Sequence, residues 1–143
     1  MDDTKAIELD PAHLRKLQLE LLDILLEFDR ICKLAGIRYV LSSGTLLGAV
    51  RYKGFIPWDD DMDVDMLRPD YEKFCRVVDQ FIDHERFFFQ STDTDGGYRW
   101  VFGKLRRKGT EYIRVWQARL GQKTGLCTTT RSEERRVGKE CRS

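Results

Sequence analysis

The feature that most restricts the fold of this chain is an acidic run in which the side chains alternate strictly. In the segment DDDMDVDML, residues 59–67, Asp61, Asp63 and Asp65 alternate with apolar side chains. Successive side chains of a β-strand point to opposite faces of the sheet. The spacing therefore predicts a strand over residues 59–67, with three carboxylates on one face and three apolar side chains on the other.

Three aspartates on one strand face need compensation, because like charges repel and aspartate is a poor strand former. A divalent cation would supply it, since Mg²⁺ takes hard oxygen ligands, commonly one or two carboxylates together with water and phosphate oxygens. An acidic run can also be a solvated turn. Pro57 and Trp58 before the run, and the apolar alternation within it, favour a structured site. We expect Trp58 to be a packing residue rather than a base-stacking platform.

The chain before this run predicts two helices with a strand between them. Asp10 and Pro11 form an N-cap and a first helical position, and Gly36 fits a left-handed C-cap. Between them, apolar residues recur at helical spacing: Leu14, Leu17, Leu21, Ile24, Leu25, Phe28, Ile31 and Cys32. Residues 37–43 (IRYVLSS) have strand composition, and residues 46–51 predict a short helix that closes near Gly54.

After the acidic run, the pattern predicts a further helix and then strands. Residues 68–70 end the acidic strand, and residues 71–81 have amphipathic helical spacing. Residues 87–90 predict a buried strand, and residues 98–105 with 112–116 a hairpin around Lys108 and Gly109. Residues 117–130 show little pattern. The order of elements predicts one domain of the α/β or α+β class, with a mixed sheet and flanking helices.

A possible phosphate site lies upstream of the acidic run. Glycine at residue 44 lets the backbone approach a phosphate closely, and the helix that follows Thr45 presents its N-terminus to an anion. Basic side chains that could contact the same phosphates are Arg51, Lys53, Lys104 and Arg106, of which Lys104 and Arg106 would share one face of their strand.

Composition excludes several classes of protein. No apolar run among the 143 residues reaches the 18 to 20 that a membrane helix needs, and the charged first ten residues are unlike a secretory signal. We therefore expect no transmembrane segment and a cytoplasmic location, with the inner membrane face as an alternative. The four cysteines form no CxxC pair, and a net charge of +1 gives no electrostatic case for nucleic acid as a partner.

The last thirteen residues differ in pattern from the rest of the chain. The run RSEERRVGKECRS, residues 131–143, has no apolar periodicity and resembles the in-frame translation of a ligated sequencing adapter. We expect a partial domain over residues 1–130 and an unstructured, adapter-derived tail over residues 131–143. A natural basic tail is the alternative. Without the tail the chain has 20 basic and 21 acidic residues.

Three segments together closely resemble the LicD family, which includes fukutin and fukutin-related protein. They are LSSGTLLGAVR at residues 41–51, KGFIPWDDDMD at 53–63 and RPDYEKF at 68–74. The likeness extends more loosely over the first helix and over FGKLRRKGT at 102–110. It implies a nucleotidyltransferase-like fold and an enzyme that moves a phosphate-linked group, such as phosphocholine or a polyol phosphate, from a CDP-linked donor to a cell-surface glycan or glycolipid.

The resemblance also implies roles for individual residues. Asp61 and Asp63 would be the catalytic pair that holds Mg²⁺ or Mn²⁺, with Asp59, Asp60 and Asp65 as less certain metal ligands. Gly44 and Thr45 would hold the donor phosphates, with Arg51 and Lys104 as supporting cations. The acceptor hydroxyl would attack the donor phosphate, and a cytidine nucleotide would leave.

Some features keep other functions open. Ser43 stands where many family members have glycine, Tyr52 where histidine is frequent, and Asp65 where glycine is common. Family members usually continue for roughly a hundred more residues, which suggests an N-terminal fragment. The alternatives are an inactive fragment or pseudo-enzyme that binds nucleotide or metal without turnover, and an acidic structural domain that binds Ca²⁺, although the run lacks the glycine turn of an EF-hand.

Overall fold

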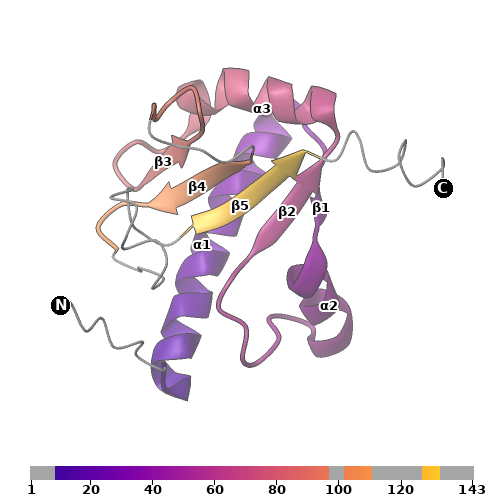
Figure 1. The fold of residues 1–143 in the computed structure, drawn as a ribbon, viewed down its shortest axis with the longest axis vertical. Coiled ribbons are helices and arrows are strands. Elements are labelled where there is room, and N and C mark those ends of the chain that lie inside the picture. Colours follow the sequence, from indigo (N-terminus) through magenta and orange to yellow (C-terminus); the bar gives the residue numbers. More distant parts are fainter. Residues whose placement is uncertain (1–8, 97–101, 111–126, 133–143) are drawn as a thin grey trace.

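The computed structural model describes residues 9–96, 102–110 and 127–132. Within these ranges, three helices accompany a mixed sheet of five strands (Figure 1). The elements in chain order are α1 (Pro11–Ala35), β1 (Val40–Leu41), α2 (Ser43–Tyr52), β2 (Asp63–Met66), α3 (Arg68–Phe81), β3 (Phe87–Gln90), β4 (Gly103–Arg107) and β5 (Cys127–Ser132). The predicted α+β class is confirmed.

Helix α1 has the ends that its sequence predicts. The Asp10 carboxylate accepts a hydrogen bond from the backbone N–H of His13 at 2.9 Å, and Pro11 occupies the first turn. Gly36 ends the helix at φ +64°, the left-handed region that glycine enters without a steric penalty. The apolar stripe of α1 is buried, and it includes Leu21, Ile24 and Phe28.

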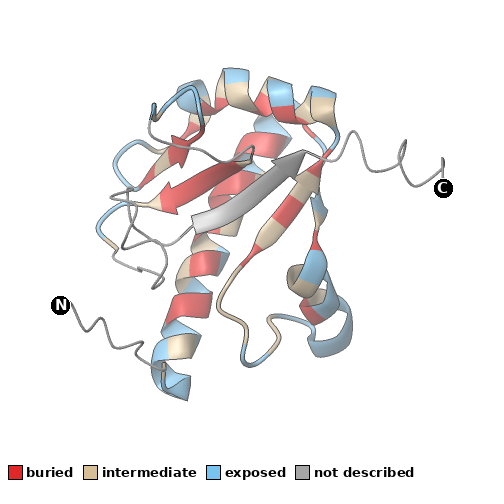
Figure 2. Cartoon of the chain, viewed as in Figure 1, coloured by how far each residue is buried: buried red, intermediate tan, exposed pale blue. Residues whose placement is uncertain are grey.

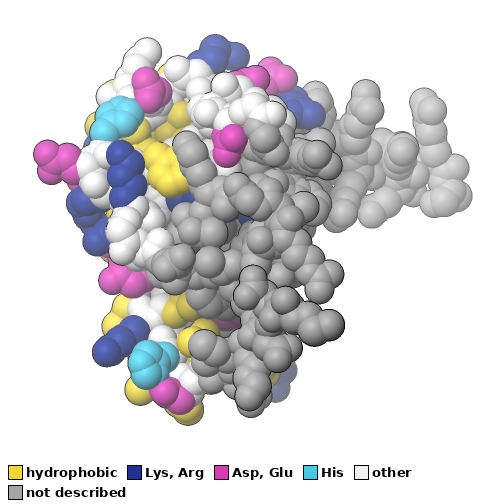
Figure 3. Space-filling view, turned by 60° about the vertical axis from the view of Figure 1, so that its left-hand side comes forward, with side chains coloured by type: hydrophobic (Ala, Val, Ile, Leu, Met, Phe, Trp, Pro, Cys, Tyr) yellow, Lys and Arg dark blue, Asp and Glu magenta, His cyan; other side chains and the backbone are white. Residues whose placement is uncertain are grey.

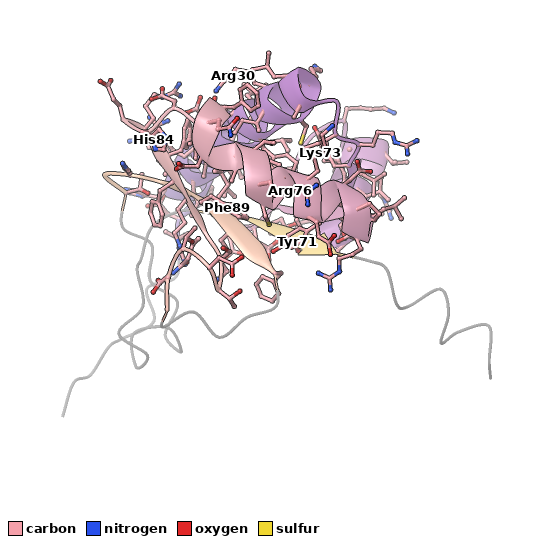
Figure 4. The ribbon with its side chains drawn as sticks, turned by 90° about the horizontal axis from the view of Figure 1, so that it is seen from above. Arg30, Tyr71, Lys73, Arg76, His84 and Phe89 are labelled. Carbon is pink, nitrogen blue, oxygen red and sulfur yellow. The ribbon has the colours of Figure 1, made fainter. Side chains whose placement is uncertain are left out.

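The strands have the order β1-β2-β5-β4-β3. β2 pairs in parallel with β5, and the other neighbours are antiparallel. α1 and α3 lie on the same face of this sheet, as two views at right angles show (Figures 1 and 4). Side chains that point toward these helices, such as Val64, Met66 and Leu105, are buried in the core.

The core between α3 and the sheet is aromatic. Figure 4 shows Tyr71 and Phe89 between α3 and the strands, and both are buried. The ring centroids of Phe74 and Phe89 lie 5.3 Å apart, and those of Phe28 and Phe74 lie 4.9 Å apart, which links both helices to the sheet. Buried residues gather on the helix faces that meet the strands (Figure 2). Because α1 and α3 cover one face of the sheet, polar side chains of the strands such as that of Asp63 lie on the opposite face.

Several predicted boundaries are wrong by a few residues. The strand predicted at 37–43 is only Val40–Leu41, because the chain turns into α2 at Ser42. The helix predicted at 46–51 begins earlier, at Ser43, and ends at Tyr52 with Lys53 as its C-cap, next to the expected close at Gly54. α3 begins at Arg68, so residues 68–70 form its first turn, with proline in the position that needs no N–H donor. The strand at Phe87–Gln90 is confirmed.

The largest difference concerns the acidic strand. β2 covers only Asp63–Met66, so residues 59–62 form a loop and the predicted row of three strand aspartates is wrong for Asp61. The cause is the short partner strand. The Ser42 N–H donates to the carbonyl of Asp63 at 3.0 Å, and beyond this point the partner chain has become α2. No β1 residue remains to pair with Asp61.

The C-terminal strands also differ from the prediction. β4 pairs with β3 and β5, while residues 112–116, the expected second half of the hairpin, lie outside the described residues. β5 was not predicted at all. It includes Arg131 and Ser132, which were assigned to the tail, and residues 133–143 lie outside the described residues.

The helices in the described part of the chain are not suited to crossing a bilayer, because none combines sufficient length with sufficient apolarity. On the face shown in Figure 3, basic and acidic side chains are interspersed over the described surface. The expectations of a cytoplasmic location and of no nucleic-acid partner stay predictions.

Candidate active site

The acidic loop brings three carboxylates together. Oxygen atoms of Asp59, Asp60 and Asp61 all lie within 4.8 Å of one another, and all three residues are half-buried. Asp59 and Asp61 were expected ligands. Asp60 was a less certain one, and the structure brings its carboxylate to the same place. A loop can gather three consecutive side chains, whereas a strand would send the middle one to the other face.

The surroundings of Asp59 disfavour the charged form of its carboxyl group. Burial and the neighbouring Asp61 carboxyl raise the pKa of Asp59 from 3.8 to about 6. The cause is physical crowding, because a partly desolvated carboxylate beside a second one resists ionisation. Hard oxygen atoms with excess negative charge match the preference of Mg²⁺ and Mn²⁺. The residues present therefore fit a divalent cation.

The N-terminus of α2 lies against this cluster. A Cβ atom added at Gly44 would be 2.9 Å from Oδ2 of Asp59, so only glycine allows this approach without a shift of the carboxylate. Within the described residues, the side chain of the N-cap Ser42 does not cap a backbone N–H of α2, and its hydroxyl lies 3.4 Å from the Ser43 hydroxyl. A helix N-terminus without a side-chain cap, beside carboxylates that could hold a cation, is suited to a phosphate group.

Thr45 connects α2 to the acidic strand. Its Oγ1 accepts a hydrogen bond from the backbone N–H of Asp63 at 3.0 Å. The predicted pairing of the Gly44–Thr45 step with the aspartate run is therefore present in the structure. Thr45 contributes through its hydroxyl, which fixes the start of β2 next to the first turn of α2.

Asp63 and Asp65 lie on β2, outside the group of three carboxylates. Their neighbours Val64 and Met66 are buried in the core, so both aspartates are on the sheet face opposite to α1 and α3. Oδ1 of Asp65 is buried without a hydrogen-bond partner. The structure thus divides the expected ligand set between the loop and this sheet face.

Lys104 shares that sheet face with Asp63. The register pairs Asp63 with Thr129 and Thr129 with Lys104, which places the three in one row across β2, β5 and β4. Two strand spacings separate Asp63 from Lys104, about 10 Å. Lys104 is only 5% exposed. Arg106 lies on the same face and donates from Nε to Oε1 of Gln90 at 2.7 Å.

Arg51, an expected supporting cation, and Trp58 lie outside the carboxylate group. Arg51 is in the last turn of α2, so about 10 Å of helix separates it from Gly44. It is exposed, with its guanidinium 5.9 Å from the ring centroid of Tyr52. Trp58, expected to be a packing residue, is 72% exposed and lies on the surface. Its ring lies edge-on to Tyr52, with centroids 6.1 Å apart, beside the acidic loop.

A hollow of about 290 Å³ opens beside the cluster, between α1 and α2. Gly44, Thr45 and Asp59 line one side of it, and Leu19, Leu22 and Leu25 of α1 line the other. The first turn of α2 and the acidic loop therefore border one shared space.

Comparison with known proteins identifies the family. Residues 36–136 match the family described as "LicD/FKTN/FKRP, nucleotidyltransferase domain". The chain belongs to the LicD family. The match begins after α1 and includes α2, the acidic loop and every strand of the sheet. The family resemblance drawn from the three sequence segments is confirmed.

Two relatives illustrate the similarity within the LicD family. The chain is 46% identical over 80 residues to the lipopolysaccharide cholinephosphotransferase LicD of Haemophilus influenzae, which covers 56% of this chain and 30% of that protein. It is 49% identical over 45 residues to an uncharacterized protein of Rickettsia typhi, covering 32% of this chain and 15% of that protein. The chain thus spans less than a third of either relative in these alignments.

Proposed function

We propose that this LicD-family chain carries the donor-binding part of a divalent-cation-dependent transferase. The enzyme would move phosphocholine, or a polyol phosphate, from a CDP-linked donor to a cell-surface glycan or glycolipid. The observation that carries the proposal is the set of three carboxylates within 4.8 Å of one another, lying against the uncapped N-terminus of α2. The relative in Haemophilus influenzae, named a lipopolysaccharide cholinephosphotransferase, supports the choice of phosphocholine.

Asp59, Asp60 and Asp61 would hold the cation, either Mg²⁺ or Mn²⁺. When bound, such an ion neutralises charge on phosphate oxygens during an in-line displacement. The raised pKa of Asp59 supports this assignment, because burial and the adjacent Asp61 carboxyl disfavour its charged form and a bound cation would favour it. Asp63 and Asp65 extend the negative potential along the adjoining sheet face.

The remaining residues of the site would bind and orient the donor. The first turn of α2 would donate backbone N–H groups to a phosphate, and Gly44 leaves room for that phosphate beside Asp59. Lys104, in one row with Asp63, would supply a positive charge on the sheet face. In the reaction, the acceptor oxygen forms a bond to the donor phosphorus as the bond to the cytidine nucleotide breaks.

Calorimetry with the full 143-residue chain tests the donor site. CDP-choline should bind in the presence of Mg²⁺, and binding should be lost in the double variant Asp59→Asn, Asp61→Asn. Asp79→Asn is a matched control, because Asp79 is exposed on α3 and its carboxylate lies 3.7 Å from His84, away from the loop. Donor binding that survives the double variant would contradict the proposal.

A second assay separates a transferase from a protein that only binds the donor. Release of CMP from CDP-choline, together with transfer of labelled choline to a lipopolysaccharide acceptor, would show turnover. Metal-dependent donor binding without CMP release, in a longer protein that contains this chain, would favour the pseudo-enzyme alternative. Binding of Ca²⁺ without any nucleotide would favour the structural one.

A further inference from the structure

A buried glutamine of α1 contacts the chain that leads into the acidic loop. Gln18 is 3% exposed, and its Nε2 donates to the backbone carbonyls of Ile56 at 3.2 Å, Pro57 at 3.4 Å and Asp59 at 3.0 Å. Gln18 lies outside residues 36–136, which carry the match to the family. Its contacts reach about 40 residues along the chain, so they belong to the tertiary structure of the site.

The side-chain amide of Gln18 has a defined orientation. Nη1 of Arg15 donates to its Oε1 at 3.1 Å, and a guanidinium can only donate. The oxygen therefore faces Arg15, and the nitrogen faces the three carbonyl oxygens. Only a hydrogen-bond donor can satisfy carbonyls grouped in this way, because carbonyl oxygens accept and never donate, and the amide N–H groups of Gln18 are such donors.

One peptide group transmits this contact to the carboxylates. The carbonyl of Asp59 that accepts from Gln18 belongs to the same planar peptide as the N–H of Asp60. That N–H donates to Oδ1 of Asp59 at 3.0 Å. The Asp59 N–H in turn donates to the carbonyl of Ile56 at 2.9 Å, which closes the turn. Fixing the Asp59 carbonyl therefore fixes the plane that orients the Asp59 carboxylate.

We propose that Gln18 is a positioning residue for the acidic cluster: it holds the 56–59 turn against α1, so that the carboxylates stay together before a cation binds. Without this anchor, three neighbouring negative charges on a loop would move apart. A cluster that is already assembled binds a cation more tightly, because less ordering accompanies binding. The effect on cation affinity rests on the proposed function, whereas the effect on the turn does not.

Matched variants on α1 test this role. Gln18→Met has similar length and no donor, and Gln18→Glu keeps the shape but presents a carboxylate to the carbonyls. Glu27→Met is the control, because Glu27 is also buried on α1 and accepts from the Asp83 N–H at 2.9 Å, near the other end of the helix. Circular dichroism checks that each variant folds. If Gln18→Glu does not fold, the test uses Gln18→Met alone.

Two measurements decide the outcome. NMR-detected amide exchange without cation should be about tenfold faster at Asp59 and Asp60 in both Gln18 variants, and unchanged there in Glu27→Met. The dissociation constant for Mn²⁺, followed by electron paramagnetic resonance, should rise about tenfold in the Gln18 variants alone. Wild-type exchange at both amides in a folded Gln18→Met protein would overturn the proposal, as would an equal effect of Glu27→Met.

Failure of the proposed function would look different. If wild-type protein binds no Mn²⁺, the metal assignment is refuted, but the exchange of the Asp59 and Asp60 amides still decides whether Gln18 holds the turn.

Discussion

The crowded carboxylates make a prediction about stability and pH. A carboxyl whose pKa rises from 3.8 to about 6 on folding has about 3 kcal/mol of free-energy difference between its two protonation states. Asp59 is only half-buried, so solvent screening reduces this to about 1 to 2 kcal/mol. The sign follows from proton binding. Between pH 3.8 and 6 the folded chain keeps a proton that the unfolded chain has released, so stability falls as the pH rises.

In the absence of a cation, the Asp59→Asn variant should therefore become more stable relative to the wild type as the pH rises from 3 to 7. We expect the free-energy difference between variant and wild type to change by about 1 to 2 kcal/mol in favour of the variant across this range. Urea unfolding followed by circular dichroism, with EDTA present, measures it at each pH. Carboxylates with lowered pKa values, such as Glu27 and Asp29, are common to both proteins and cancel in the difference.

The neighbouring carboxyl provides an independent check. Asp61→Asn removes one of the causes of the raised pKa, so the Asp59 pKa should fall toward its ordinary value, as followed by ¹³C NMR of the carboxyl carbon. Asp79→Asn should leave it unchanged. A variant-to-wild-type difference that is independent of pH from 3 to 7 would refute the reasoning, because it would mean that Asp59 titrates alike in the folded and unfolded chains.

Three further substitutions test the backbone around the site by urea unfolding. Gly48→Ala should lower stability by about 2 kcal/mol, because its Cβ would lie 2.5 Å from the carbonyl oxygen of Gly54, and wild-type stability would contradict that packing. Ser43→Gly should raise stability by about 0.5 to 1 kcal/mol, since Ser43 has φ +50°, and a loss would mean that this strain is absent. Thr45→Val should lower it by about 1 to 2 kcal/mol by leaving the Asp63 N–H without its acceptor, and no change would show that the hydrogen bond is not formed.

The helices were predictable because their information is local. α1 has its cap, its proline, its apolar spacing and its final glycine within one continuous segment, and the structure agrees with all four. Ser43 has a left-handed conformation at φ +50°. The family resemblance led us to expect glycine at this position, and glycine enters this region without the Cβ clash that serine accepts.

The strands were harder because their limits depend on partners that are distant in sequence. β5 (CTTTRS) lacks the alternation that identifies a half-buried strand, and its position comes from pairing with both β2 and β4. The start of β2 likewise depends on where α2 begins. Local pattern identified the aspartates as a unit, but it could not show that the first three belong to a loop.

The sequence does contain a signal for the role of Gln18, which is a polar residue within the apolar stripe of α1. Leu25 and Cys32 follow it at intervals of seven residues, so the position belongs to the stripe of α1 that faces the interior. A polar residue in such a stripe must find a buried partner. Its partners are carbonyls of a segment about 40 residues away, which only the fold brings within reach.

The division of the aspartates between loop and strand has a geometric cause. A strand would alternate Asp59, Asp60 and Asp61 between two faces, and one of them would enter the core beside Val64. The turn over residues 56–59 avoids this and lets all three carboxylates meet. Asp63, two residues later, then lies on the sheet face in one row with Lys104. Because the Asp63 N–H is bonded to Thr45, the loop cluster and the sheet face meet at the first turn of α2, where a donor phosphate would contact both.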